Sequence, residues 1–106
     1  MEQNQKIREM QILEQNFQNL LLQKQAFEME SSETKSALEE IKKSEGDVFK
    51  IIGQLMIKTE KNKIAGELEN KEKIISLRLK TIEKQESSLS EKLEKLREEL
   101  IKSSKK

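Results

Sequence analysis

The sequence is characterised first by the residues that it lacks. Its 106 residues contain no cysteine, no histidine and no proline. Without cysteine there is no disulfide framework and no thiolate chemistry. Without histidine, the commonest general base and metal ligand is missing. These absences argue against an enzyme and against a metal or cofactor site, while the lack of proline leaves little to interrupt a helix.

Apolar residues are also scarce. They make up 33% of the chain and charged residues 39%, whereas ordinary globular domains are ~45–50% apolar. A thick two-layer core is therefore not expected, and the length allows a single domain over residues 1–106. No apolar run approaches the ~20 residues that span a bilayer, and the N-terminal residues show no secretory signal. The simplest expectation is a cytoplasmic protein that does not enter a membrane.

The charges give no reason to expect a nucleic acid as partner. The net charge is +1, and acidic residues are interleaved with basic ones throughout. Tyrosine and tryptophan, which stack on bases in many nucleic-acid-binding proteins, are absent. Binding to a phosphate backbone through the basic second half of the chain is thus a weak alternative.

Two heptad runs predict two long helices, over about residues 5–43 and 61–103, each roughly 60 Å in length. Seven of ten a and d positions are apolar in the first run and nine of eleven in the second. Thr59 or Asn62 is expected to act as the N-cap of the second helix. The first seam consists of Met10, Leu13, Phe17, Leu20, Lys24, Phe27, Ser31, Thr34, Leu38 and Ile41. The second consists of Ala65, Leu68, Glu72, Ile75, Leu79, Ile82, Glu86, Leu89, Leu93, Leu96 and Leu100.

The two seams fit each other in antiparallel orientation. They match when paired residue numbers sum to about 106, which places the connecting segment at the centre of the alignment. On this register Lys24 and Glu86 lie near the same level. Glu72 and Glu86 on the seam are expected to specify register or to loosen the packing rather than to perform acid–base chemistry. An extended coiled coil with a second copy of the chain is the alternative.

The segment between the helices predicts a β-hairpin over about residues 48–58. β-Branched residues are dense on both sides of Gly53-Gln54, a pair suited to a tight turn. Both faces are apolar, and a lone two-stranded hairpin is only marginally stable. Strands from other subunits must therefore pair with it, and a shared β-barrel would satisfy the edges. The residues expected to mediate this oligomerisation are Val48, Phe49, Ile51, Ile52, Leu55, Met56 and Ile57.

This arrangement resembles the prefoldin family, and specifically its β-class subunits. The hairpin residues Val48 to Lys50, with Gly53 and then Leu55 to Thr59, are similar to the strand–glycine–strand hairpin of that family. The flanking stretches 24–41 and 77–96, the latter with its Thr81-Ile-Glu-Lys-Gln-Glu86 segment, are also similar. The resemblance covers roughly Phe17 to Leu100. The helices are more similar to those of archaeal β subunits than to those of the eukaryotic sixth subunit, and both origins stay as alternatives.

The resemblance implies a heterohexamer of two α-class and four β-class subunits, built on a double β-barrel from which coiled coils extend. It also implies an ATP-independent chaperone that captures unfolded polypeptides and passes them to a group II chaperonin. Gly66, inside the second helix near its start, is a departure from the family pattern, and a glycine within a helix costs ~1 kcal/mol. It is expected to allow close packing beside the barrel.

Client binding is expected at the helix ends remote from the hairpin, where off-seam apolar residues gather. Exposed apolar surface of this kind often marks an interaction site. The candidate client-binding residues are Ile7, Met10, Ile12, Leu13, Leu93, Leu96, Leu100 and Ile101. For Met10, Leu13, Leu93 and Leu96, a purely structural role in the seam is the equal alternative. The competing function for the whole chain is a scaffold or tether without chaperone activity.

Overall fold

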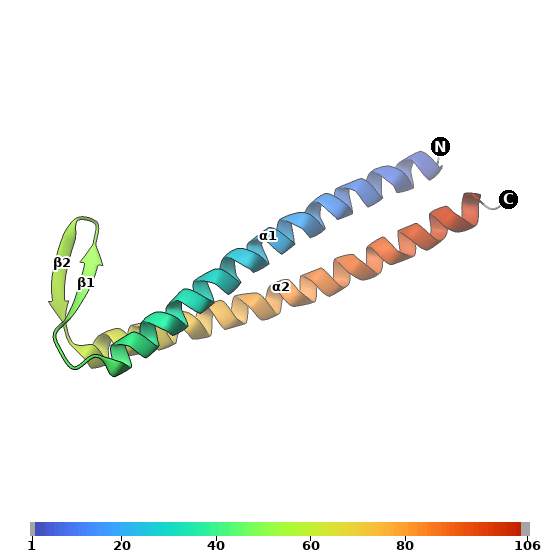
Figure 1. Cartoon of the computed structure of the whole chain (residues 1–106). Helices are drawn as coiled ribbons and strands as arrows, with labels where there is room; N and C mark the ends of the chain where they lie inside the picture. Colours follow the sequence, from blue (N-terminus) through green and yellow to red (C-terminus); the bar gives the residue numbers. More distant parts are fainter. Residues whose placement is uncertain (1, 105–106) are drawn as a thin grey trace. The chain divides into compact units, whose positions relative to one another are not determined.

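A computed structural model describes residues 2–104 of the chain. Helix α1 spans Glu2–Lys43, strand β1 Val48–Ile52, strand β2 Leu55–Thr59 and helix α2 Lys61–Ser104 (Figure 1). This confirms the predicted fold class of two long helices with a central antiparallel hairpin. Helix α1 begins at Glu2, three residues before the predicted start. The chain forms two compact units, one of residues 1–26 and 79–106 and the other of residues 27–78.

Within each unit, stretches of α1 and α2 pair in antiparallel orientation. All ten positions of the first predicted seam and all eleven of the second are buried or half-buried. In the first unit the partners Gln3 and Ser103 are joined by a hydrogen bond, and their residue numbers sum to 106. In the second unit Lys35 pairs with Glu72, and their numbers sum to 107. The register expected from the heptads is therefore the observed one.

The core is thin, as the composition predicts. The buried apolar side chains are those of Ile82 and Leu93 in the first unit, and of Ile64 and Ile75 in the second. No side chain of the described residues is fully buried. A two-helix layer covers each seam from one side only, so most seam residues keep some contact with solvent.

In the second unit, Lys61 links the start of α2 to the end of α1. Helix α1 ends with Lys42 and Lys43 in its last turn, and the Ser44 N–H donates to the Ile41 carbonyl at 3.2 Å, a tightened final turn. The Lys61 ammonium, at the first position of α2, donates to the carbonyls of Lys42 at 3.1 Å and Ser44 at 2.9 Å. These bonds satisfy carbonyl groups that the end of a helix leaves without intrahelical partners.

The start of α2 differs from the predicted one. Glu60 occupies the N-cap position, because its carbonyl accepts the first helical hydrogen bond from the N–H of Ile64 at 3.1 Å. Thr59 is the last residue of β2, and Asn62 already lies within the helix. The prediction that Thr59 or Asn62 caps the helix was wrong, because the hairpin extends up to the residue before the cap.

The hairpin turns on Gly53. Its φ of +60° is the only positive φ among the described residues, so the following Gln54 has a negative φ. A positive φ at the first central residue alone is the pattern of a type II′ turn, which matches the twist of paired strands. This two-residue turn sets the pairing of the two strands, with Ile52 opposite Leu55 and Val48 opposite Thr59.

Candidate functional site

The hairpin is the most apolar exposed element of the described chain. Six large apolar side chains are exposed on its ten strand residues, and only Val48 among the predicted oligomerisation residues is half-buried. The exposed ones are Phe49, Ile51, Ile52, Leu55, Met56 and Ile57. So much exposed apolar surface on one small element is typical of a protein interface.

Both faces of the hairpin contribute to this surface. Cross-strand partners share a face, so Ile52, Leu55 and Ile57 lie on one face together with Val48 and Lys50. The other face carries Phe49, Ile51, Met56 and Lys58. Lys50 forms an ion pair with Glu67 of α2 at 3.2 Å, which links its face to the helix. A single partner surface cannot cover both faces, so the hairpin is suited to insertion between several elements.

The edges of the hairpin offer backbone groups for pairing as well. The described part of the chain forms a two-stranded sheet. With a two-residue turn, Ile52 and Leu55 form a hydrogen-bonded pair, and hydrogen-bonded and open pairs then alternate along the strands. The backbone groups of Phe49 and Ile51 on β1, and of Met56 and Lys58 on β2, therefore point outward from the sheet. They are placed to receive strands of other chains.

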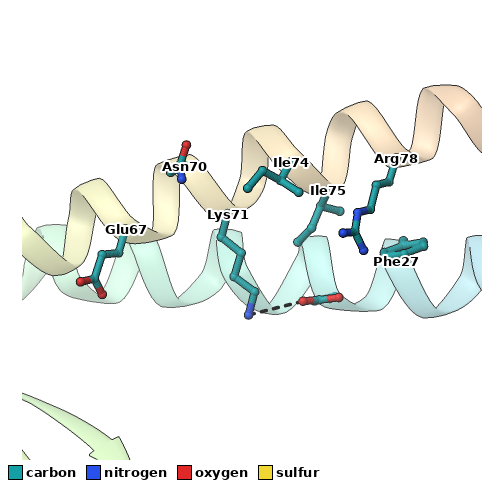
Figure 2. A pocket seen from close by; sticks show the side chains of 8 residues that line it. Phe27, Glu67, Asn70, Lys71, Ile74, Ile75 and Arg78 are labelled. Carbon is teal, nitrogen blue, oxygen red and sulfur yellow. Dashed lines mark ion pairs between the residues drawn. The ribbon is translucent and has the colours of Figure 1, made fainter.

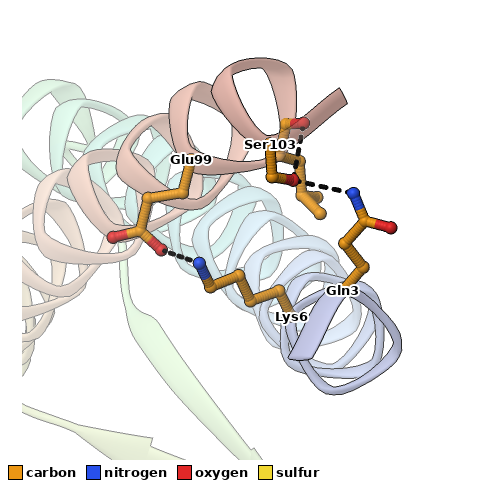
Figure 3. Close-up of polar contacts among 5 residues, drawn as sticks. Gln3, Lys6, Glu99 and Ser103 are labelled. Carbon is orange, nitrogen blue, oxygen red and sulfur yellow. Dashed lines mark hydrogen bonds and ion pairs between the residues drawn. The ribbon is translucent and has the colours of Figure 1, made fainter. Parts of the chain in front are cut away.

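The far ends of the helices, in the first unit, carry the predicted client-binding residues. A hydrogen bond of 2.8 Å from Gln3 to Ser103 and an ion pair of 3.5 Å between Lys6 and Glu99 hold the two helices together there (Figure 3). Ile7, Ile12 and Ile101 are exposed by 42%, 61% and 48%. These three residues therefore lie on the surface of the first unit.

The other predicted client-binding residues belong more to the seam. Met10, Leu13, Leu96 and Leu100 are half-buried, and Leu93 is buried, with 8% of its surface exposed. Leu93 therefore contributes mainly to helix packing, which is the alternative that its seam position left open. The assignment of client contacts to the whole set stays a prediction.

A polar layer interrupts the seam in the second unit. Ser31 and Thr34 are buried, and the Ser31 hydroxyl donates to a carboxylate oxygen of Glu72 at 2.7 Å. The Thr34 hydroxyl donates to the Glu30 carbonyl of its own helix, also at 2.7 Å. The second carboxylate oxygen of Glu72 is buried without a hydrogen-bond partner. A shift of register would separate the Ser31 hydroxyl from the Glu72 carboxylate, so this layer favours the observed register.

Beside this layer lies an open hollow of about 290 Å³ (Figure 2). The Arg78 guanidinium stands over the ring of Phe27, 5.7 Å from its centroid, a cation–π arrangement. Lys71 and Glu30 form an ion pair of 3.4 Å across the two helices. The charges in the hollow are thus largely matched within the chain.

Neither a metal site nor a membrane-spanning segment is found among residues 2–104. No three His, Cys, Asp or Glu side chains there lie close enough to hold a metal ion. Neither helix contains a stretch apolar and long enough to cross a bilayer.

Comparison with known proteins identifies the fold. The family described as Prefoldin subunit matches residues 4–106. The prefoldin subunit beta of Thermococcus onnurineus is 42% identical over 89 residues, covering 82% of this chain and 77% of that protein. The one from Methanosarcina acetivorans is 38% identical over 100 residues, covering 92% and 85%.

A crystal structure of the prefoldin beta subunit from Thermococcus strain KS-1 matches with a TM-score of 0.92 and 31% identity. The match covers 99% of this chain and 94% of that one. These likenesses favour a chaperone subunit over an unrelated coiled-coil tether. The chain belongs to the prefoldin family, as a β-class subunit of this chaperone.

Proposed function

We infer that the chain assembles through its hairpin with an α-class subunit and further β-class copies, in a hexamer of two α and four β subunits. The assembled complex holds unfolded polypeptides at the helix ends and delivers them to a group II chaperonin in the cytoplasm without ATP. It acts by binding alone and catalyses no reaction. The observation that carries this proposal is the exposure of apolar side chains on both faces of the hairpin.

Burial of the hairpin supplies a driving force for assembly. Covering a large apolar side chain fully is worth about 1.5–3 kcal/mol relative to leaving it in water. Six such side chains are exposed on the hairpin, and neighbouring strands would also satisfy the outward backbone groups of Phe49, Ile51, Met56 and Lys58. Closing hairpins from several subunits into a barrel removes the free edges altogether.

Capture of clients requires apolar surface that stays open after assembly. Ile7, Ile12 and Ile101 are exposed at the ends of the helices farthest along the chain from the hairpin. Aliphatic side chains without a shaped pocket suit clients of varied sequence. Several subunits acting together on one client would add avidity.

The test is reconstitution. The chain would be mixed with an α-class subunit and sized by sedimentation, and the product would then be added to a chemically denatured protein without nucleotide. We expect a hexamer that suppresses aggregation of the denatured protein. A hexamer that leaves aggregation unchanged would support the tether instead, and a chain that stays monomeric with every α-class subunit would contradict the assembly proposal.

The client site is tested by changing the three exposed isoleucines, Ile7, Ile12 and Ile101, to serine together. Each lies outside the buried seam, so the helices should fold and the hexamer should form. We expect weaker suppression of aggregation than with the unchanged chain. Unaltered protection by an intact hexamer would move the capture site away from the helix ends.

A further inference from the structure

The first unit contains a groove between α1 and α2, centred on the ring of Phe17. It consists of two adjoining hollows of about 260 and 330 Å³ that share Phe17 and Ser90. Phe17 is half-buried and Leu93, which also lines the groove, is buried. Ser87 and Ser90 stand on the α2 side. Because these serine side chains are small, the aromatic floor of the groove is left open.

The rim of the groove is acidic. Glu14 of α1 and Glu86, Glu91 and Glu94 of α2 line it, against a single cation, Arg97. Arg97 lies 3.6 Å from Glu94, and Glu86 is paired with Lys24 at 3.3 Å. The remaining carboxylates, those of Glu14 and Glu91, therefore give the groove an excess of negative charge.

Helical spacing extends the groove toward the ends of the helices. Residues seven apart lie on the same face of a helix, so Ile7 lies on the face of α1 that carries Glu14. Ile101 likewise lies on the face of α2 that carries Glu94 and Ser87. More than two fifths of the surface of each isoleucine is exposed to solvent. The surface thus combines an aromatic floor, an acidic rim and aliphatic side chains toward its end.

We propose that this groove, defined by Phe17, Ser87, Ser90, Glu14 and Glu91, binds an extended segment of an unfolded client in which apolar side chains alternate with lysine or arginine. The apolar side chains of the client lie on the ring of Phe17, and its cations face Glu14 and Glu91. This deepens the proposed function, on which it rests, by giving the client segments a preferred charge.

Charge complementarity selects this occupant over others. An acidic segment would bring like charges to Glu14 and Glu91, and a purely apolar one would leave both carboxylates without a partner. Opposite charges at an exposed rim raise the rate of encounter and discriminate between partners more than they raise affinity. The preference for cationic segments should therefore be strong at low salt and fade as the screening length shortens.

Two serines of α2 provide a matched test. Ser90 lies in the groove, and Ser76 is exposed and belongs to the second unit, outside the groove. The changes Ser90→Arg and Ser76→Arg alter charge and size identically. Arginine is a better helix former than serine, so both variants should keep their helical circular dichroism and unfolding midpoint.

The experiment measures binding of a labelled, unstructured leucine–lysine peptide to the full chain by fluorescence anisotropy, with a leucine–glutamate peptide of the same length as comparison. We expect the lysine peptide to bind more tightly. Ser90→Arg should weaken its binding about tenfold, the equivalent of ~1.4 kcal/mol, and Ser76→Arg should leave it within about twofold.

Equal effects of the two variants, or equal binding of the two peptides by the unchanged chain, would overturn the groove proposal. The proposed function is judged separately, by aggregation suppression with the reconstituted complex. Suppression that persists in the Ser90→Arg complex, together with equal peptide binding, would leave the chaperone function standing and remove only the groove. A complex that never suppresses aggregation would remove the function itself.

Discussion

The Lys24 ammonium lies 3.3 Å from a carboxylate oxygen of Glu86, across the seam between α1 and α2, and both side chains are about three-quarters removed from solvent. Each occupies a position where the heptad pattern asks for an apolar residue. A charged pair at such a site contributes little net stability, because desolvation offsets much of the attraction. It does specify which residues can face each other, since shifting the register would leave both charges in the seam without partners.

Replacing this pair tests that view. Lys24→Leu alone should destabilise the chain, because Glu86 would remain in the seam without its partner. The double change Lys24→Leu with Glu86→Leu should raise stability above that of the unchanged chain, by about 1–2 kcal/mol. Thermal unfolding followed by circular dichroism measures both. A double variant less stable than the unchanged chain would show that the pair contributes stability rather than specificity.

The polar layer gives a second prediction. Ser31 supplies the 2.7 Å hydrogen bond to Glu72, whose other carboxylate oxygen is already buried without a partner. Ser31→Ala should therefore lower the free energy of unfolding by about 1–2 kcal/mol. The neighbouring Ser32 is exposed, and Ser32→Ala serves as the control, with a change of less than about 0.5 kcal/mol. Urea titrations that give the same value for both serines would contradict this role of the hydrogen bond.

Much of this fold could be predicted from the sequence because it depends on local periodicity. Every position that the heptads assigned to the two seams is buried or half-buried, although the buried Ile64 lies outside the predicted seam. The apolar segment around Gly53 identified the hairpin, since a two-residue turn needs a residue that accepts positive φ. The contact between Lys24 and Glu86 followed from the same register. The burial of Ser31 and Thr34 in the seam has the same origin, because periodicity assigns positions regardless of residue type.

Other features depend on contacts that periodicity does not encode. The N-cap at Glu60 was missed because capping preferences favour Thr59 and Asn62, while the length of β2 decides where the helix begins. The link from Lys61 to the end of α1 joins residues whose proximity exists only once the hairpin has formed. For the client-binding residues, the composition of the helix ends predicted apolar surface. Only the packing separates the exposed Ile7, Ile12 and Ile101 from the buried Leu93.

Gly66 provides a third prediction with two separate outcomes. A β-carbon added at this position meets no atom within 4 Å beyond its own turn of the helix, so helix packing within the chain does not require glycine there. Gly66→Ala should raise the stability of the isolated chain by about 0.5–1 kcal/mol. If another subunit packs closely against this turn beside the barrel, the same change should weaken assembly. Loss of stability in the isolated chain would contradict the open space at this site.

The most direct test of assembly through the hairpin is the variant Ile57→Asp. Ile57 is exposed by 44% in the single chain, so an aspartate there should leave the helices and their unfolding midpoint largely unchanged. In a barrel shared between subunits, the same aspartate would be a buried charge without a partner, which is strongly unfavourable. The control is Leu22→Asp, an equally drastic change at an exposed position of α1. Sedimentation with an α-class subunit should show loss of the hexamer for Ile57→Asp and a normal hexamer for Leu22→Asp. An intact hexamer containing Ile57→Asp would contradict assembly through the hairpin.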